Sequence, residues 1–313
     1  MLAAEPAMKI LVTGSHGVIG QALIEALQAR GDGPVRLVRG PSRPSSAEPA
    51  WDPTAGRIDE NRLEGFDAMV HLAGESLAAG RWTPARKARI RDSRVNGTRL
   101  LAGALGRLSR PPRVLVSASA VGYYGDRGDE IVREESPPGT GFLADVCRQW
   151  EDAVEPARRA GIRVVNIRTG LVLSSAGGML PRILPLFRLG LGGRLGSGRQ
   201  YMSWIAIEDV VGALLHLMAH EAIQGPVNLV SPHPVTNREF TSALGRVLSR
   251  PTPFPVPAPA LRIVLGEVAG ELVASVRAEP ARLMASGYSF GFPDIDGALR
   301  GLLSRSRGQR DPV

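Results

Sequence analysis

The residues best suited to chemistry lie in a glycine-rich run near the start of the chain. Three glycines spaced by two residues follow the apolar run 9–13 directly. After a buried strand, the first glycine allows a tight turn, the second lets the backbone approach a pyrophosphate, and the third lets a helix pack closely on the strand. The helix N-terminus then offers free N–H groups and a positive dipole end to phosphates. The run predicts a dinucleotide site formed by Gly14, Ser15, Gly17, Val18, Ile19 and Gly20.

The end of the next apolar run, residues 35–38, indicates which dinucleotide this is. NAD-binding proteins place Asp or Glu there to hold the ribose hydroxyls. This chain has Arg39 instead, with Arg43 just beyond it. An arginine can pair with a 2′-phosphate, whereas NAD would leave it without a partner. We therefore expect NADP(H) as the cofactor and Arg39 as a contact to it, with a solvated Arg39 as the alternative.

The elements that position these residues alternate between strand and helix. Apolar runs at 9–13, 35–38, 68–72, 114–117 and 164–167 are separated by helical patterns, the first over 18–30. Such alternation predicts right-handed crossovers and a parallel sheet. We expect an α/β fold, a Rossmann doubly wound parallel sheet over residues 8–222, with a smaller C-terminal substrate-side region over 223–305.

Several segments between and after these runs have distinct compositions. Residues 40–56 and 190–198 are expected to be loops, the second packed near a ligand. The proline-rich run 251–259 predicts an extended connector. Residues 260–276 have a helical pattern, and 280–303 is expected to be a small appended unit.

Several motifs in order resemble the extended branch of the short-chain dehydrogenase/reductases. They are His71-Leu72-Ala73-Gly74, Ser93-Arg94-Val95-Asn96-Gly97-Thr98, Gly122-Tyr123-Tyr124-Gly125 and Gly287-Tyr288-Ser289-Phe290. The chain is most similar to an atypical NAD-dependent epimerase/dehydratase-like subgroup with a small C-terminal domain of unknown function.

The resemblance implies further cofactor contacts. It places Leu72, Ala73 and Gly74 beside the adenosine and ribose, and Val172 at the nicotinamide end. Leu72, Ala73 and Val172 are equally natural core residues. Arg94 is read as a phosphate or ribose contact, against a surface salt bridge, and Asn96 as a support of the catalytic geometry.

Active members of this superfamily use a Tyr-x-x-x-Lys pair, in which lysine lowers the pKa of the tyrosine. The chain has two lysines, Lys9 and Lys87, and neither follows a tyrosine by four residues. The family's helix falls on residues 142–151, with Leu143 at the tyrosine position and Cys147 at the lysine position. Cys147 is read as packing rather than as a nucleophile. The remaining catalytic candidates are Ser117, Ser119, Tyr123 and Tyr124.

Composition limits the other classes of function. The formal charge of +8 comes from arginines spread along the chain, so no nucleic-acid partner is expected. One cysteine excludes a cysteine metal cluster and agrees with a cytoplasmic location, and no metal site is expected. No run is long enough for a membrane helix. The leading interpretation is an NADP(H)-dependent oxidoreductase or epimerase-like enzyme acting on an unidentified small molecule, with a homodimer left open. A non-catalytic NADP(H) sensor is the alternative, and a nucleotide-sugar epimerase comes third.

Overall fold

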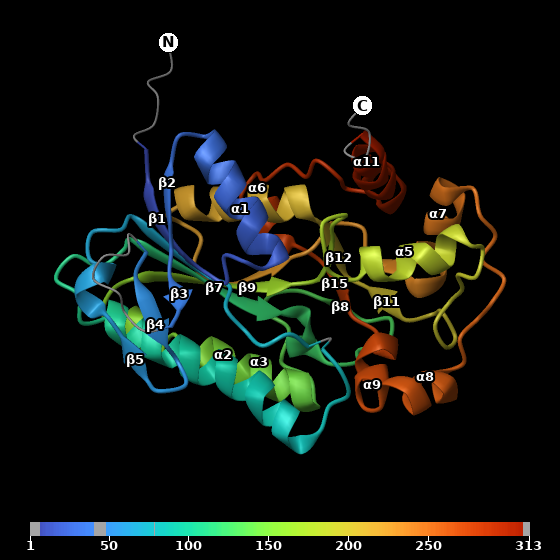
Figure 1. Ribbon diagram of the computed structural model, residues 1–313, viewed down its shortest axis with the longest axis horizontal. Coiled ribbons are helices and arrows are strands. Elements are labelled where there is room, and N and C mark those ends of the chain that lie inside the picture. The colour runs from blue at the N-terminus through green and yellow to red at the C-terminus, as the bar shows by residue number, and fades with distance from the viewer. Residues whose placement is uncertain (1–6, 41–47, 78, 309–313) are drawn as a thin grey trace, which may run out of the picture.

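A six-stranded parallel sheet lies at the centre of the computed structural model, which describes residues 7–40, 48–77 and 79–308 (Figure 1). The strand order is β13-β9-β7-β6-β1-β2. The strands are β1 (Lys9–Thr13), β2 (Gly33–Arg36), β6 (Ala68–His71), β7 (Val114–Ala120), β9 (Arg163–Thr169) and β13 (Gly225–Leu229). The central strands are almost continuously apolar because both faces of the sheet are covered.

Two groups of helices cover the two faces of the sheet (Figure 1). On one face, α1 (Val18–Ala29) and α6 (Ile207–Ala219) enclose a core that includes Ile10, Val12 and Leu23. The opposite face is covered by α2 (Pro84–Leu105), α3 (Phe142–Asp152) and α4 (Glu155–Arg159), over a second core containing Leu11 and Met69. Alternate residues of β1 thus enter different cores, as the two-residue period of a strand requires.

The strand order reverses between β1 and β6, because β2 lies on one side of β1 and β6 to β13 follow on the other. Ligands of doubly wound sheets bind outside the carboxyl ends of the strands at such a reversal. The glycine-rich turn follows β1 at this point, and Leu72 follows β6. The Rossmann expectation is confirmed.

Residues 40–56 were expected to form a surface loop, and the structure corrects this expectation. It contains β4 (Ala50–Asp52), which pairs with β3 (Val38–Arg39) and β5 (Arg57–Ile58) in a separate small sheet, followed by the 3-10 helix η1 (Glu60–Leu63). Trp51 is 2% exposed and meets the ring of His71 edge-on at 5.8 Å. The proline- and serine-rich sequence around Trp51 is typical of a loop, but the Trp51 side chain belongs to the second core.

Residues after 222 complete the sheet and build a third core. The sixth strand, β13, follows the domain end expected at residue 222. The third core includes Leu173, Trp204, Phe240 and Leu299. It is formed mainly by β10 (Leu171–Leu173), β12 (Trp204–Ala206), α5 (Leu180–Arg188), α7 (Asn237–Leu248) and α11 (Ile295–Gly308). The tail expected as an appended unit is therefore part of a shared core.

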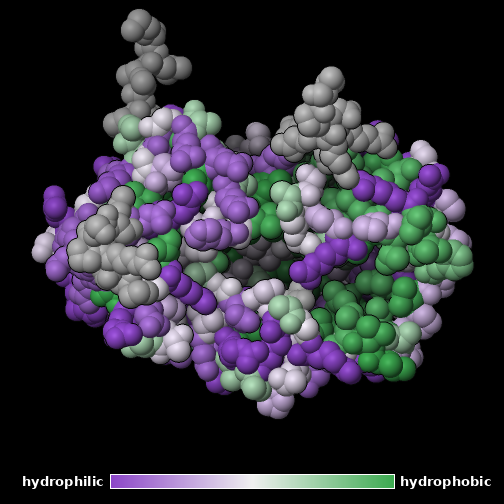
Figure 2. Space-filling view, viewed as in Figure 1, coloured by the Kyte–Doolittle hydropathy of each residue, from purple (hydrophilic) through white to green (hydrophobic). Residues whose placement is uncertain are grey.

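The remaining elements lie around this third core. Short pairings join β11 (Tyr201–Met202) to β14 (Val235–Thr236) and β8 (Ile131–Val132) to β15 (Arg277–Ala278). The helical pattern of 260–276 is two helices, α8 (Ala258–Leu265) and α9 (Val268–Val273), separated at Gly266 with φ +65°. Figure 2 shows apolar side chains gathered over this end of the molecule. A short helix, α10 (Ala281–Ala285), precedes α11, and none of the described helices is long and apolar enough to span a bilayer.

Candidate functional site

Two of the three glycines in the turn after β1 are required by close backbone packing. Gly14 has φ +65°, and a Cβ atom there would lie 2.7 Å from the carbonyl group of Leu72. At Gly20 a Cβ would lie 2.3 Å from the carbonyl oxygen of Gly14. The turn therefore packs directly against the end of β6, and α1 packs directly against the turn. Both roles agree with the prediction from spacing.

Gly17 has a different environment, which suits an approaching phosphate. It is exposed at the N-cap of α1, and its only close neighbour in the direction of a Cβ is the Gly14 oxygen at 3.3 Å. Of its neighbours, Ser15 is buried, whereas Val18 and Ile19 are half-buried, with Ile19 against the first core. The open backbone at Gly17 and the free N–H groups of the first helical turn form a cradle that fits a pyrophosphate.

A buried chain of hydrogen bonds fixes the end of β6 beside this turn. The Thr13 hydroxyl oxygen accepts from the backbone N–H groups of Leu72 at 3.1 Å and Ala73 at 3.2 Å. It also lies 2.7 Å from Nδ1 of His71, whose Nε2 lies 2.9 Å from Oγ1 of Thr98. Two accepted bonds use both lone pairs of the Thr13 oxygen, so its proton must go to Nδ1. We therefore assign His71 as neutral, with its proton on Nε2 and donated to Thr98.

Burial lowers the pKa of His71 to about 4. The side chain is 0% exposed. A second ring proton on Nδ1 would find no acceptor, because Thr13 has no lone pair left for it. His71 belongs to a motif that was recognised in the sequence, but its role as a neutral residue that positions the end of β6 was not predicted.

Arg94 on α2 lies inward beside Gly74. Its guanidinium carbon would be 3.2 Å from a Cβ at Gly74 and lies 5.0 Å from the ring of Trp150. Its hydrogen bonds go to the carbonyl oxygens of Glu75 and Ile90. Burial lowers the pKa of this guanidinium, and among the described residues it forms no salt bridge. The alternative of a surface salt bridge is therefore not what the structure shows, and the cation is available to an anion.

Asn96, two residues later, is exposed on α2 and does not share the face of Arg94. Residues two apart on a helix do not face the same side. Arg94 and Asn96 therefore lie on different sides of α2, and the role of Asn96 in supporting the catalytic geometry stays a prediction. Arg39, at the end of β3, is exposed and forms no ion pair with any described residue. Arg43 lies outside the described residues.

The expected nicotinamide end of the site lies between β10 and the start of α1. Val172 and Leu72 are half-buried and pack against the first core. Each can therefore be a core residue and still have a surface left for the cofactor. Beyond β10, a Cβ at Gly177 would lie 2.4 Å from a methyl of Val18. The segment after β10 therefore covers the beginning of α1.

The positions of the family's catalytic pair are filled by packing residues. A Cβ at Gly122 would lie 3.2 Å from Cβ of Leu143 and 4.0 Å from the sulfur of Cys147, so this face of α3 rests on η2 (Val121–Tyr124). Cys147 is 3% exposed, and burial raises the pKa of its thiol to about 12. The thiol is protonated at neutral pH, which agrees with packing rather than nucleophilic chemistry.

Two of the four catalytic candidates, Ser119 and Tyr124, bond to buried partners. Ser119 donates to Glu151 at 2.6 Å, and Glu151 forms a two-point ion pair with Arg168. Arg168 donates to the hydroxyl of Tyr124, which donates to Asn228 at 2.7 Å. Burial raises the pKa of Tyr124 to about 12. Ser119 and Tyr124 are thus parts of a buried polar network and not free catalytic groups.

Ser117 and Tyr123 differ from each other in their access to the cleft. Ser117 is 0% exposed in the middle of β7, where no substrate reaches it. Tyr123 is half-buried, with its ring 3.5 Å from the guanidinium carbon of Arg168 and edge-on to Tyr124. Its hydroxyl has no hydrogen bond to any described residue. Tyr123 is the one candidate whose hydroxyl is left for a ligand.

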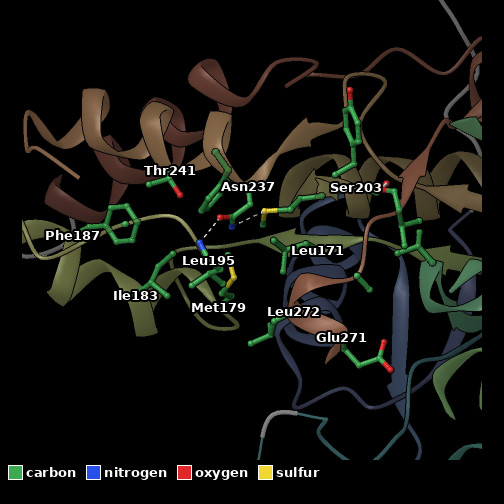
Figure 3. Close-up of a pocket in the computed structure, with 17 residues that line it drawn as sticks. Leu171, Met179, Ile183, Phe187, Leu195, Ser203, Asn237, Thr241, Glu271 and Leu272 are labelled. Atoms are coloured by element: carbon green, nitrogen blue, oxygen red, sulfur yellow. Dashed lines mark hydrogen bonds between the residues drawn. The ribbon is translucent and has the colours of Figure 1, made fainter. Parts of the chain in front are cut away.

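A cavity of about 220 Å³ begins beside this segment and was not predicted as such. Val121 of η2 and Leu171 of β10 line it at the carboxyl edge of the sheet, and Figure 3 shows Met179, Ile183 and Leu195 at its middle. Leu195 belongs to the 190–198 loop, which was expected near a ligand. Trp204, nearby in sequence, is 0% exposed and lies in the third core. The lining comes from η2, β10, α5, α7 and α9, which no local pattern brings together.

Two known families match parts of the chain. Residues 10–229 match the NAD dependent epimerase/dehydratase family, and 256–302 match a domain of unknown function, DUF1731. The chain is 47% identical to the epimerase family protein Mb2239 of Mycobacterium bovis, over 93% of this chain and 96% of the relative. Human SDR39U1 (isoform 2), crystallised with NADPH, has a TM-score of 0.87 and 33% identity, covering 95% of this chain and 99% of that one. A nucleoside-diphosphate sugar epimerase of Corynebacterium glutamicum has a TM-score of 0.77 and 37% identity, covering 97% and 61%.

Proposed function

Because the chain belongs to the NAD dependent epimerase/dehydratase family, we propose that it is an NADP(H)-dependent oxidoreductase that works without the Tyr-x-x-x-Lys pair. The observation that carries the proposal is the combination of an open glycine-rich turn before α1 with a cavity that begins beside η2 and β10. Gly17 leaves room for the pyrophosphate, and the cavity begins at Val121 and Leu171. A cytoplasmic location and a homodimer remain predictions.

The choice of NADP(H) over NAD(H) is supported by charge and by a relative. Arg39 is exposed at the strand end where NAD-binding proteins carry an acid, and it has no carboxylate partner among the described residues. The human relative SDR39U1 was crystallised with NADPH. Arg94 is a half-buried cation whose hydrogen bonds within the described chain go to neutral carbonyl groups, and it is suited to a phosphate or ribose of the same cofactor.

Bound NADPH would supply a hydride to a carbonyl carbon, and the carbonyl oxygen would take a proton from the protein. We assign that proton to the hydroxyl of Tyr123. Leu143 carries no proton that could be transferred, and the thiol of Cys147 lies against η2 with its pKa raised. Tyr124 is engaged with Asn228 and Arg168, which leaves its half-buried neighbour Tyr123 in the same segment.

One observation favours a second function, a non-catalytic NADP(H) sensor. Ser117, Ser119 and Tyr124 all lie buried, so the part of the site that usually performs proton transfer is built as packing. A nucleotide-sugar epimerase is the third candidate. The name of the Corynebacterium glutamicum relative supports it, but the chemistry needs the absent tyrosine of the pair.

The experiment measures NADPH affinity by fluorescence and NADPH consumption by absorbance, with carbonyl compounds as substrates. Tyr123→Phe should lower turnover and leave NADPH affinity unchanged. Tyr124→Phe, the matched control, should instead lower the free energy of unfolding by about 1–3 kcal/mol, because Asn228 and Arg168 lose a buried partner. Full activity of Tyr123→Phe would remove Tyr123 as the donor. Tight NADPH binding without turnover in the unmutated protein would favour the sensor.

A further inference from the structure

The cavity beside the nicotinamide end has a lining that discriminates between classes of substrate. Most of its lining residues are apolar, among them Leu171, Met179, Ile183 and Phe187. Asn237 supplies an amide, but its oxygen already accepts from the Leu195 N–H at 2.7 Å. No arginine, lysine or histidine is among the lining residues of the described chain.

We propose that this cavity is the substrate site and that it takes a compact, uncharged, apolar carbonyl compound rather than a nucleotide sugar. The inference rests on the proposed oxidoreductase function and goes beyond it, because it names the class of substrate. Three independent features support it, which are the charge, the size and the entrance of the cavity.

Among the described residues that line the cavity, the one charged group is an acid, Glu271 of α9. Figure 3 shows Glu271 on the side of the cavity away from Thr241. Its carboxyl has no hydrogen bond or ion pair with a described residue, and burial raises its pKa. A nucleoside diphosphate needs arginine, lysine or a helix N-terminus to hold its phosphates. Here it would meet a carboxyl group in surroundings that already disfavour negative charge.

The cavity is too small to enclose a whole nucleotide sugar in the described conformation. At about 220 Å³ it is smaller than typical drug-sized ligand pockets of roughly 300–1,000 Å³. An apolar protein cavity of about 150 Å³ is known to bind benzene. The present volume therefore suits one ring with a short side chain, or an aliphatic compound of similar size.

The entrance to the cavity is also apolar. Leu272 lines the cavity and is 38% exposed, so the cavity reaches the surface at α9. On the adjoining α8, Ile263 and Val264 are 75% and 68% exposed. Figure 2 shows an apolar region at the end of the molecule where α8 and α9 lie. An uncharged ligand would meet apolar surface from the mouth to the interior.

The test uses two probes of nearly equal shape, phenylacetone and phenylacetate, of which only the second is charged. Each is titrated calorimetrically into the full-length protein saturated with NADPH, and UDP-glucose is titrated in parallel. Phenylacetone should bind at least tenfold more tightly than phenylacetate, and UDP-glucose should give no binding. Glu271→Gln should reduce the difference between the two matched probes.

Cavity-filling variants locate the binding. Ile183→Trp should abolish phenylacetone binding, whereas Leu186→Trp, on the exposed side of the same helix, should leave it unchanged. Ala274→Leu fills the cavity from a segment outside α5, and it replaces Ile183→Trp as the test variant if that protein does not fold. The inference would be overturned if both filled variants still bound phenylacetone, or if the protein preferred phenylacetate or UDP-glucose. It would also be overturned if the NADPH-bound protein did not bind phenylacetone. Failure to bind NADPH would instead overturn the proposed function.

Discussion

Acidification should weaken the folded protein through one buried side chain, His71. The unfolded chain takes a proton on this residue below the ordinary pKa of 6.5, whereas the folded protein does so only near its lowered pKa of about 4. Between these values the unfolded state holds more protons, so the free energy of unfolding falls as the pH is lowered. The full shift corresponds to about 3 kcal/mol, of which about 2 kcal/mol is lost between pH 7 and pH 5.

Urea denaturation at pH 7 and pH 5 measures this loss, with His71→Gln as the test variant. The variant is expected to be less stable at pH 7, because Thr13 and Thr98 lose their shared partner, but its stability should fall less on acidification. His216, whose pKa is also lowered by burial, is retained in both proteins, so its contribution cancels. His233→Gln, at an exposed histidine, should behave like the unmutated protein. Equal losses in the unmutated protein and in His71→Gln would refute the assignment of a neutral buried His71.

Three further predictions concern the cofactor and the absent pair. NADPH should bind more tightly than NADH, and Arg39→Ala should narrow the difference by on the order of 1–3 kcal/mol, as for a charged hydrogen bond; equal affinities before mutation would contradict this. Gly17→Val should abolish dinucleotide binding with a native circular dichroism spectrum, whereas Gly20→Val should lower the melting temperature, because its Cβ would lie 2.3 Å from a carbonyl oxygen. The double variant Leu143→Tyr/Cys147→Lys should not increase NADPH consumption, and a clear gain in turnover would show that the site still accepts the pair.

The parts of the fold that were predictable from the sequence are those with local causes. The turn from Gly14 to Gly20 depends on contacts with β1, β6 and α1, and each element has its own apolar period or glycine signal. Trp51 was misplaced because its flanks resemble a loop, while its burial depends on the approach of the distant His71. Local composition describes the flanks correctly and says nothing of that approach.

The catalytic candidates were chosen by residue type, and their partners decided their roles. Tyr124 and Asn228 are 104 positions apart in sequence, and Ser119 and Glu151 are 32 apart. A serine or tyrosine that bonds a ligand and one that bonds a buried acid look identical in a sequence. The cavity was missed for the same reason, because its lining extends from Val121 to Val276.

The loss of the catalytic lysine and the position of Arg94 are connected in this fold. Cys147, at the lysine position, lies close enough to Arg94 for the guanidinium charge to act on its thiol. A lysine ammonium there would face a like charge in a buried site, which is unfavourable for both groups. We therefore expect the positive charge beside the cofactor to come from Arg94 of α2 instead of from α3. An arginine keeps its proton at any ordinary pH, so it can hold an anion but cannot relay a proton. On this proposal binding and proton transfer are separated: Arg94 holds an anion of the cofactor, and the proton for catalysis comes from another element, for which Tyr123 of η2 is the proposed source.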